Sequence, residues 1–150
     1  MHPEELKALV RLFFEEVWNR GNVAALEVFL EPDFVFHNPI LPETGNGIEG
    51  YRQIVLTLRS AFPDQRWTLE EVLADNDTDK VIARWTMHGT HTGAYRSVSP
   101  SGKMVDFSGI SIYRFVGGRV AEEWTVSDAL GLLWQEGYLP IPAQAVTVGA

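Results

Sequence analysis

The sequence predicts an α+β fold, in which a bent antiparallel or mixed sheet wraps around N-terminal helices and leaves one deep pocket. Apolar residues recur at helical spacing as far as Phe62, and the alternation typical of strands dominates from Arg66 onward. Helices followed by an antiparallel sheet are the arrangement of α+β domains. The length of 150 residues is that of one domain. The pattern places this domain over residues 1–139 and a weakly patterned tail over 140–150.

Three helices are predicted ahead of the sheet. Gly21 ends the first, Pro32 ends the second, and Asn22 is placed to cap the second. A short strand and a loop that contains proline and glycine lead into the third helix. The helices are expected over residues 4–20, 23–30 and 49–62, the short strand over 33–37 and the loop over 38–47.

Four further strands and a final helix complete the predicted domain. A polar turn at residues 76–79 joins the first two strands, and Gly117 with Gly118 turns the last two into a hairpin. Gly137 ends the final helix. The strands are expected over residues 66–75, 80–90, 103–116 and 119–128, and the helix over 129–136.

Composition excludes several classes of partner and site. The formal net charge of −8 argues against nucleic acid, and the lack of a long basic run argues against a membrane surface. We find no apolar stretch of the roughly 20 residues that a membrane-spanning helix needs, and the acidic N-terminus does not resemble a signal peptide. A cytoplasmic protein is therefore expected. The chain has no cysteine, which excludes disulfides, thiolate zinc sites and a cysteine nucleophile.

The hairpin of the last two strands carries the strongest indication of a ligand site. Successive side chains of a strand point to opposite faces, so Phe107, Ser111 and Tyr113 share one face. This mixture of apolar and polar groups suits a ligand cavity better than a dry core. In the return strand Glu123 and Thr125 share a face, while Glu122, Trp124 and Val126 lie on the other.

Two carboxylates are candidates for a general base. Asp128 follows the last strand, and a carboxylate in an apolar pocket has the raised pKa that proton abstraction next to a carbonyl needs. It is equally well placed to cap the helix that begins at Ala129. Glu123 is the second candidate, although an ion pair with Arg84 or Arg114 is the favoured interpretation, since charges in strands usually pair or meet water.

Two histidines invite a metal site, but their spacing argues against it. His88 and His91 are three residues apart in a predicted strand and so point to opposite faces, whereas zinc needs converging ligands. No metal is expected. His91 instead donates a hydrogen bond either at the pocket mouth or within a loop.

Aromatic residues at strand spacing offer flat walls for an aromatic ligand. Any one of them is more often core than ligand contact, and Tyr113 is the expected exception because its buried hydroxyl needs a partner. The residues considered for this role are Phe36, Trp85, Phe107, Tyr113 and Trp124.

Several short motifs, in this order, resemble one family. They are residues 18–22 (WNRGN), 37–39 (HNP), 50–52 (GYR), 61–64 (AFPD), 89–93 (GTHTG), 107–109 (FSG) and 122–124 (EEW) with Asp128. The pattern resembles the NTF2-like, ketosteroid-isomerase-like cone fold, and its details are similar to the SnoaL-like polyketide (ester) cyclases. No motif is specific alone; their order and spacing together are.

This resemblance implies a chemistry. The best-known members close a ring of an aromatic polyketide by intramolecular aldol condensation, without metal or cofactor. They need a general base beside an activated methylene and a polar cavity that holds the enolate. The family's catalytic aspartate falls at Thr125 here, three residues before Asp128, and its partner histidine at Tyr113; Asn38 and His91 match polar positions of the family.

Three functions remain open from the sequence. The first is a cofactor-independent cyclase or isomerase acting on an apolar, polyketide-like carbonyl compound, with Asp128 as base and Asn38, His91 and Tyr113 as hydrogen-bonding groups. The second is a non-catalytic module that binds a small molecule or a protein; a carboxylate that faces the cavity with nothing to neutralise it would favour the enzyme. The third is epoxide hydrolysis, in which Arg84 would take part. Further substrate contacts are expected from Phe36, Arg84, Trp85, Phe107, Glu123, Trp124 and Thr125, and a homodimer is expected to form through the outer face of the sheet.

Overall fold

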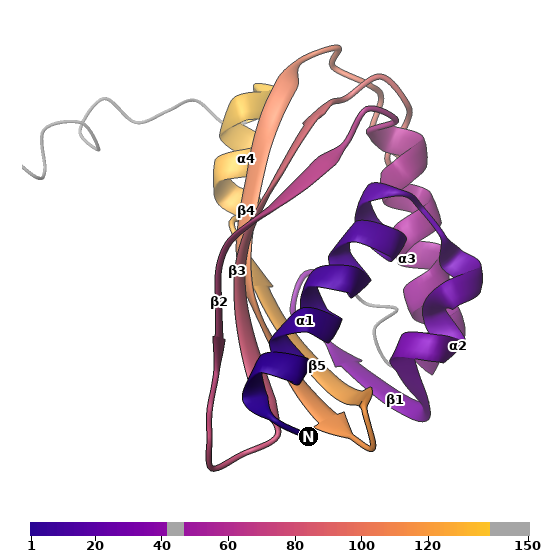
Figure 1. The fold of residues 1–150 in the computed structure, drawn as a ribbon. Helices are drawn as coiled ribbons and strands as arrows, with labels where there is room; N and C mark the ends of the chain where they lie inside the picture. Colours follow the sequence, from indigo (N-terminus) through magenta and orange to yellow (C-terminus); the bar gives the residue numbers. More distant parts are fainter. Residues whose placement is uncertain (42–46, 139–150) are drawn as a thin grey trace, which may run out of the picture.

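The computed structural model describes residues 1–41 and 47–138 and shows one bent sheet around a group of helices (Figure 1). The chain begins with α1 (Pro3–Phe13), the π-helical turn η1 (Phe14–Asn19), the 3₁₀ turn η2 (Val23–Ala25) and α2 (Leu26–Phe29). Then come β1 (Leu30–His37), α3 (Gly47–Ala61), β2 (Arg66–Ala74), β3 (Lys80–Thr90), β4 (Met104–Val116), β5 (Arg119–Ser127) and α4 (Ala129–Glu136).

The five strands form a mixed sheet in the order β1-β5-β4-β3-β2. β1 runs parallel to β5, and the other neighbours are antiparallel. α1 and α3 lie on the concave side of this sheet, and α4 lies on the opposite side (Figure 1). The predicted α+β class and the predicted wrapping of the sheet around the N-terminal helices are thereby confirmed.

The core forms where the inward faces of the strands meet the helices. In β3 buried and exposed residues alternate, and Val81, Ala83, Trp85 and Met87 point inward. α1 buries Leu6, Val10 and Phe13, which recur at helical spacing. The amphipathic patterns in the sequence thus correspond to one contiguous core between sheet and helices.

A glycine in β4 allows the Trp85 indole to lie across the inner face of the sheet. Gly109 is the strand partner of both Trp85 and Ser127. A Cβ atom added at Gly109 would lie 2.4 Å from Trp85 Cζ2 and 2.8 Å from the Val126 carbonyl oxygen. Only a residue without a side chain therefore leaves room for the indole, which lines the cavity described below.

The start of the chain differs from the prediction in three details. The first helix continues beyond α1 as a π-helical turn. Asn22 does not cap the next helical turn, because its side-chain amide donates to Glu16 instead (3.4 Å). β1 begins at Leu30 rather than 33 and includes Pro32; a proline is tolerated there because β1 is an edge strand whose pairing with β5 is interrupted between Leu30 and Val35.

Elsewhere the predicted elements match the structure closely. β3 and α4 have the predicted bounds, and β2, β4, β5 and α3 differ from prediction by one or two residues at an end. The predicted tail over residues 140–150 lies outside the described residues. Within the described part of the chain, no helix has the length and apolar character to cross a membrane.

Candidate active site

A small cavity lies between the concave face of the sheet and the helices. Its volume is about 80 Å³, and most of its lining is aromatic or aliphatic. The side chains with a hydroxyl, amide or carboxyl group among the described lining residues are Asn38, Tyr51, Tyr95, Ser111, Tyr113, Glu123, Thr125 and Ser127. This volume is well below the ~300–1,000 Å³ of sites that hold drug-sized ligands.

Glu123 is the only acidic residue among the described lining residues, and none of them is lysine, arginine or histidine. Its side chain is buried, with 3 % of the residue exposed. Burial raises the pKa of Glu123 to about 7, and the hydrogen bonds from Thr125 and Tyr51 moderate this rise. A carboxyl group with this pKa exchanges its proton near neutral pH, as a general base must.

Two chains of hydrogen bonds end on the Glu123 carboxylate. In one, the Trp18 indole donates to the Tyr51 hydroxyl (3.2 Å), which donates to Glu123 Oε1 (3.1 Å). In the other, the Trp85 indole donates to Ser111 Oγ (3.0 Å), and Ser111 Oγ lies 2.7 Å from Thr125 Oγ1. Thr125 then donates to Glu123 Oε2 (2.6 Å). Both carboxylate oxygens are thus fixed in position.

Two phenols accompany the carboxylate. Burial raises the pKa of Tyr51 and of Tyr113 well above the ordinary value, and the negative charge of Glu123 raises both further. Tyr113 is directly opposite Glu123 in the β4–β5 ladder. Both phenols therefore stay protonated at the pH at which Glu123 titrates, so both can donate a hydrogen bond.

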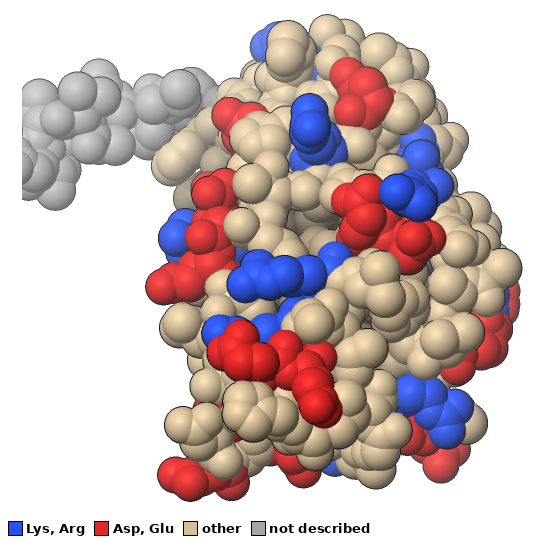
Figure 2. All heavy atoms as spheres, viewed as in Figure 1, with Lys and Arg blue, Asp and Glu red and all other residues tan. Residues whose placement is uncertain are grey.

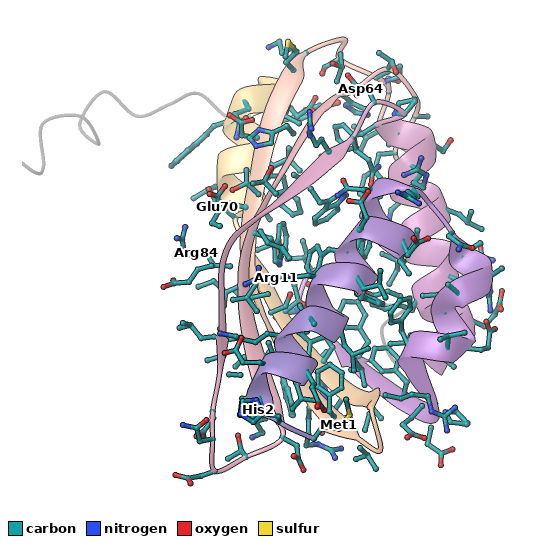
Figure 3. All side chains as sticks on the ribbon, viewed as in Figure 1. Met1, His2, Arg11, Asp64, Glu70 and Arg84 are labelled. Atoms are coloured by element: carbon teal, nitrogen blue, oxygen red, sulfur yellow. The ribbon has the colours of Figure 1, made fainter. Side chains whose placement is uncertain are left out.

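The structure brings most of the predicted site residues into this cavity. The candidates found in its lining are Phe36, Asn38, Trp85, Phe107, Tyr113, Glu123 and Thr125. The predicted ion pair of Glu123 is wrong, because Arg84 pairs with Glu71 (3.5 Å) and Arg114 pairs with Glu122 (3.2 Å). Both arginine side chains lie on the outer face of the sheet. Figure 3 shows the labelled Arg84 side chain pointing away from the helices.

Asp128 lies outside the cavity. It is exposed, and its carboxylate accepts a hydrogen bond from the Gly131 backbone N–H (2.9 Å), which makes it the N-cap of α4. Glu123, Thr125 and Ser127 line the cavity, so the alternation of β5 already places the next residue, Asp128, on the outer side. The capping interpretation of Asp128 is therefore confirmed, and the carboxylate that lines the cavity is that of Glu123.

His91 is buried beyond the end of β3, behind Phe62, and is not itself among the described lining residues. Its Nδ1 lies 3.0 Å from Glu136 Oε2, and its ring stacks on Phe62 at a centroid distance of 5.1 Å. His88 instead pairs with Asp106 on the outer face (2.5 Å). His91 thus anchors α4 and the loop after β3, as the loop interpretation predicts; across the described ranges, no acidic and histidine side chains group as a metal site.

Trp124 and Arg84 also lie on the outer face rather than in the cavity. The Trp124 ring stacks on His37 (centroids 5.5 Å apart), and the Lys80 ammonium lies 5.5 Å from its centroid. Because Glu123 points inward, its neighbour Trp124 must point outward. The same alternation places Arg84 outward, since Trp85 points inward.

Sequence reasoning missed Tyr51 and Trp18 as members of the site. Tyr51 lies on the apolar face of α3, and only its hydroxyl distinguishes it from a core residue. Its partner Glu123 is 72 residues further along the chain. A tyrosine on an otherwise aliphatic helix face is a weak signal for such a contact, because a buried hydroxyl needs a hydrogen-bond partner.

One face of the molecule carries both signs of charge (Figure 2). On the face shown in Figure 2, acidic and basic side chains are interspersed rather than gathered into one patch. The excess of negative charge is therefore not concentrated on this face into a binding surface of one sign.

Comparison with known proteins places these features in a family. The family model for SnoaL-like polyketide cyclase matches residues 8–136. Aklanonic acid methyl ester cyclase AcmA of Streptomyces galilaeus is 24% identical over 134 residues, which cover 89% of this chain and 91% of that protein.

Solved structures agree with this match. A protein from Acidithiobacillus ferrooxidans, assigned as a polyketide cyclase, is 33% identical, with a TM-score of 0.79 over 89% of this chain and 95% of the other. AclR of Streptomyces galilaeus, assigned as a hydroxylase, is 28% identical, with a TM-score of 0.82 over 98% of this chain and 90% of the other. These relatives share the fold but differ in assigned activity, so the reaction must be argued from the site. The chain belongs to the SnoaL-like polyketide cyclase family.

Proposed function

We propose that this protein is a cyclase- or isomerase-type enzyme that removes a proton beside the carbonyl of an uncharged, largely apolar small molecule, with Glu123 as the general base. One observation carries this proposal: Glu123 is a buried carboxylate in a cavity whose described lining offers no cation to neutralise it. A non-catalytic binding module has no need of such a group, which costs folding free energy whenever it is ionised.

The geometry supports a complete proton abstraction. Ionised Glu123 takes the proton from carbon, and the electron pair of the C–H bond moves toward the carbonyl oxygen. The phenol of Tyr113 is a donor available to that developing oxyanion, whereas the hydroxyl hydrogen of Tyr51 is already donated to Glu123. A donor in a dry cavity stabilises the oxyanion more than water would. The uncharged substrate follows from the same lining, because a carboxylate substrate would meet Glu123 with no described cation to balance it.

The size of the cavity limits the substrate. A volume of about 80 Å³ holds only a small part of a polycyclic compound. A substrate the size of a polyketide therefore requires lining side chains to move as it enters. Small planar compounds are the appropriate first probes.

The proposal predicts a pH-dependent rate with a small reporter. 5-Nitrobenzisoxazole is neutral and planar, and its ring opens when a base removes its single acidic C–H proton. The observed rate constant with the wild-type protein should rise with pH and level off above an apparent pKa of about 7, because only ionised Glu123 accepts the proton. The release of the coloured phenolate measures this rate. A rate that stays at the buffer background, or one that rises without a plateau as for hydroxide, would contradict the proposal.

We also propose that the outer face of the sheet is a homodimer interface. Apolar side chains are exposed there, among them Ile110 (49 %) and Val126 (66 %). Light scattering should give about twice the chain mass of 16.8 kDa, and Val126→Lys should shift the mass toward the monomer because it places a charge in the interface. A wild-type monomer at micromolar concentration would contradict this proposal.

A further inference from the structure

The hydrogen bonds between Trp85 and Glu123 have a defined direction. The Trp85 indole can only donate, so Ser111 Oγ must accept from it. Thr125 donates to Glu123 Oε2, so the hydrogen between Ser111 and Thr125 belongs to Ser111. With Glu123 ionised, every hydrogen of this chain therefore points toward the carboxylate.

Protonation of Glu123 at Oε2 allows the opposite direction. The new O–H group donates to Thr125 Oγ1, which frees the Thr125 hydrogen to donate to Ser111. Ser111 now accepts from both Thr125 and Trp85, which uses both of its lone pairs. The hydrogen of Ser111 then has two acceptors within reach: the hydroxyl of its neighbour Tyr113, and an oxygen of a ligand in the cavity that Ser111 lines.

We propose that Ser111 and Thr125 form a two-hydroxyl relay that returns the proton from Glu123 to an oxygen anion of the bound product. The proposal rests on the proposed function of Glu123 as base. After Glu123 has taken the proton from carbon, the carbonyl chemistry leaves a negative charge on an oxygen. Glu123 gives its proton to Thr125, Thr125 gives its own to Ser111, and Ser111 gives its own to that oxygen.

This step is balanced and restores the starting arrangement. One O–H bond breaks at Glu123, and one forms on the product, while each hydroxyl loses one proton and gains another. Afterwards Thr125 again donates to ionised Glu123, and Ser111 again donates to Thr125. That is the pattern of hydrogen bonds found in the structure.

The distances favour this route over the one through Tyr51. The oxygen atoms along the relay are 2.6 Å (Glu123–Thr125) and 2.7 Å (Thr125–Ser111) apart, at the short end of hydroxyl hydrogen bonds. Tyr51 lies 3.1 Å from Glu123, and the hydrogen of its phenol is confined near the ring plane. Short bonds between freely rotating hydroxyls are the better path for a proton.

Other titratable groups near Glu123 do not compete for this role near neutral pH. α3 contributes Tyr51 and β4 contributes Tyr113, and both phenols keep their protons because burial raises their pKa values. β1 contributes Phe36 inward, while His37 faces outward with Glu122. Of the described groups packed against Glu123, none carries a positive charge, so a change near pH 7 reports Glu123 itself.

The relay can be tested by the carbonyl ¹³C signal of bound acetophenone labelled at the carbonyl carbon. In the wild-type protein this signal should move downfield when the pH falls from well above to well below 7, because Ser111 then donates to the ketone oxygen. The affinity should rise about fivefold, the value of one hydrogen bond. Ser111→Ala and Thr125→Val should lose most of both changes, and Thr125→Ser should keep them, since it restores the hydroxyl.

Two results would overturn the relay. If the signal of acetophenone bound to the wild-type protein does not respond to pH, Ser111 presents no switchable donor. If Ser111→Ala keeps the full shift, Glu123 donates to the ligand directly. The rate of benzisoxazole opening tests the base alone, because its phenolate product needs no returned proton. Failure of the base and failure of the relay are therefore distinguishable.

Discussion

Glu123→Gln is expected to lower the rate of 5-nitrobenzisoxazole opening by about 10²- to 10⁴-fold, the usual contribution of a positioned general base. Glutamine has nearly the same shape as glutamate, and its amide can still hydrogen-bond to Tyr51 and Thr125. It cannot accept a proton near neutral pH. The substitution therefore removes the base and changes little else. Stopped-flow absorbance of the phenolate measures the rate of ring opening in both proteins.

The matched control is Glu122→Gln, the same change one residue earlier. Glu122 lies on the outer face, where it pairs with His37 (2.7 Å) and Arg114 (3.2 Å). The rate should stay within about twofold of the wild type, since surface substitutions rarely have larger effects. Asp128→Asn, which keeps an oxygen for the cap of α4, should also retain the rate. A loss in Asp128→Asn with full activity in Glu123→Gln would return the role of base to Asp128.

Glu123→Gln is also expected to stabilise the fold at high pH, by about 3 kcal/mol. The folded protein holds the pKa of Glu123 at about 7, against an ordinary value of 4.5, because burial disfavours the charge. Between these two values the folded state binds more protons than the unfolded state, so stability falls as pH rises. Each unit of pKa corresponds to about 1.4 kcal/mol, so the full penalty is present only above pH 7. Glutamine removes it.

Urea unfolding monitored by tryptophan fluorescence measures this difference. Wild type and Glu123→Gln should be nearly equal in stability close to pH 4.5 and should diverge until the pH exceeds 7. Glu122→Gln should show the opposite sign. Its pKa is lowered, first by the hydrogen bond with His37, so its carboxylate stabilises the fold above pH 4.5 and loses that effect as the pH falls. Parallel curves for wild type and Glu123→Gln would show that Glu123 has an ordinary pKa.

Both expectations depend on which carboxylate faces the cavity, and the sequence identifies only part of that answer. Alternation along β5 predicts that Glu123 and Thr125 share one face and that Trp124 lies on the other, as the structure has it. It does not say which face is inside. The prediction that Trp124 contacts the substrate was inconsistent with this alternation. In the structure the Trp124 ring stacks on His37 on the outer face.

Residues at the ends of strands were the hardest to place. Asp128 and His91 each lie just beyond the end of a strand, where strand pairing no longer determines the partners of a side chain. Asp128 turned to the N-terminus of α4, and His91 paired with Glu136, 45 residues away. The capping role was visible in the sequence because a cap is a local hydrogen bond, whereas the contact with Glu136 was not.

The order of helices and strands, the grouping of side chains into faces and the family of the fold could all be predicted from the sequence. These depend on the spacing of apolar residues and on short turns, which are properties of neighbouring residues. That Glu123 is buried in the cavity with a raised pKa emerges only from the three-dimensional arrangement. Its pKa depends on loss of water, on Tyr51 from a distant helix and on the lack of a cation in the described lining, and all three arise when the sheet closes on the helices.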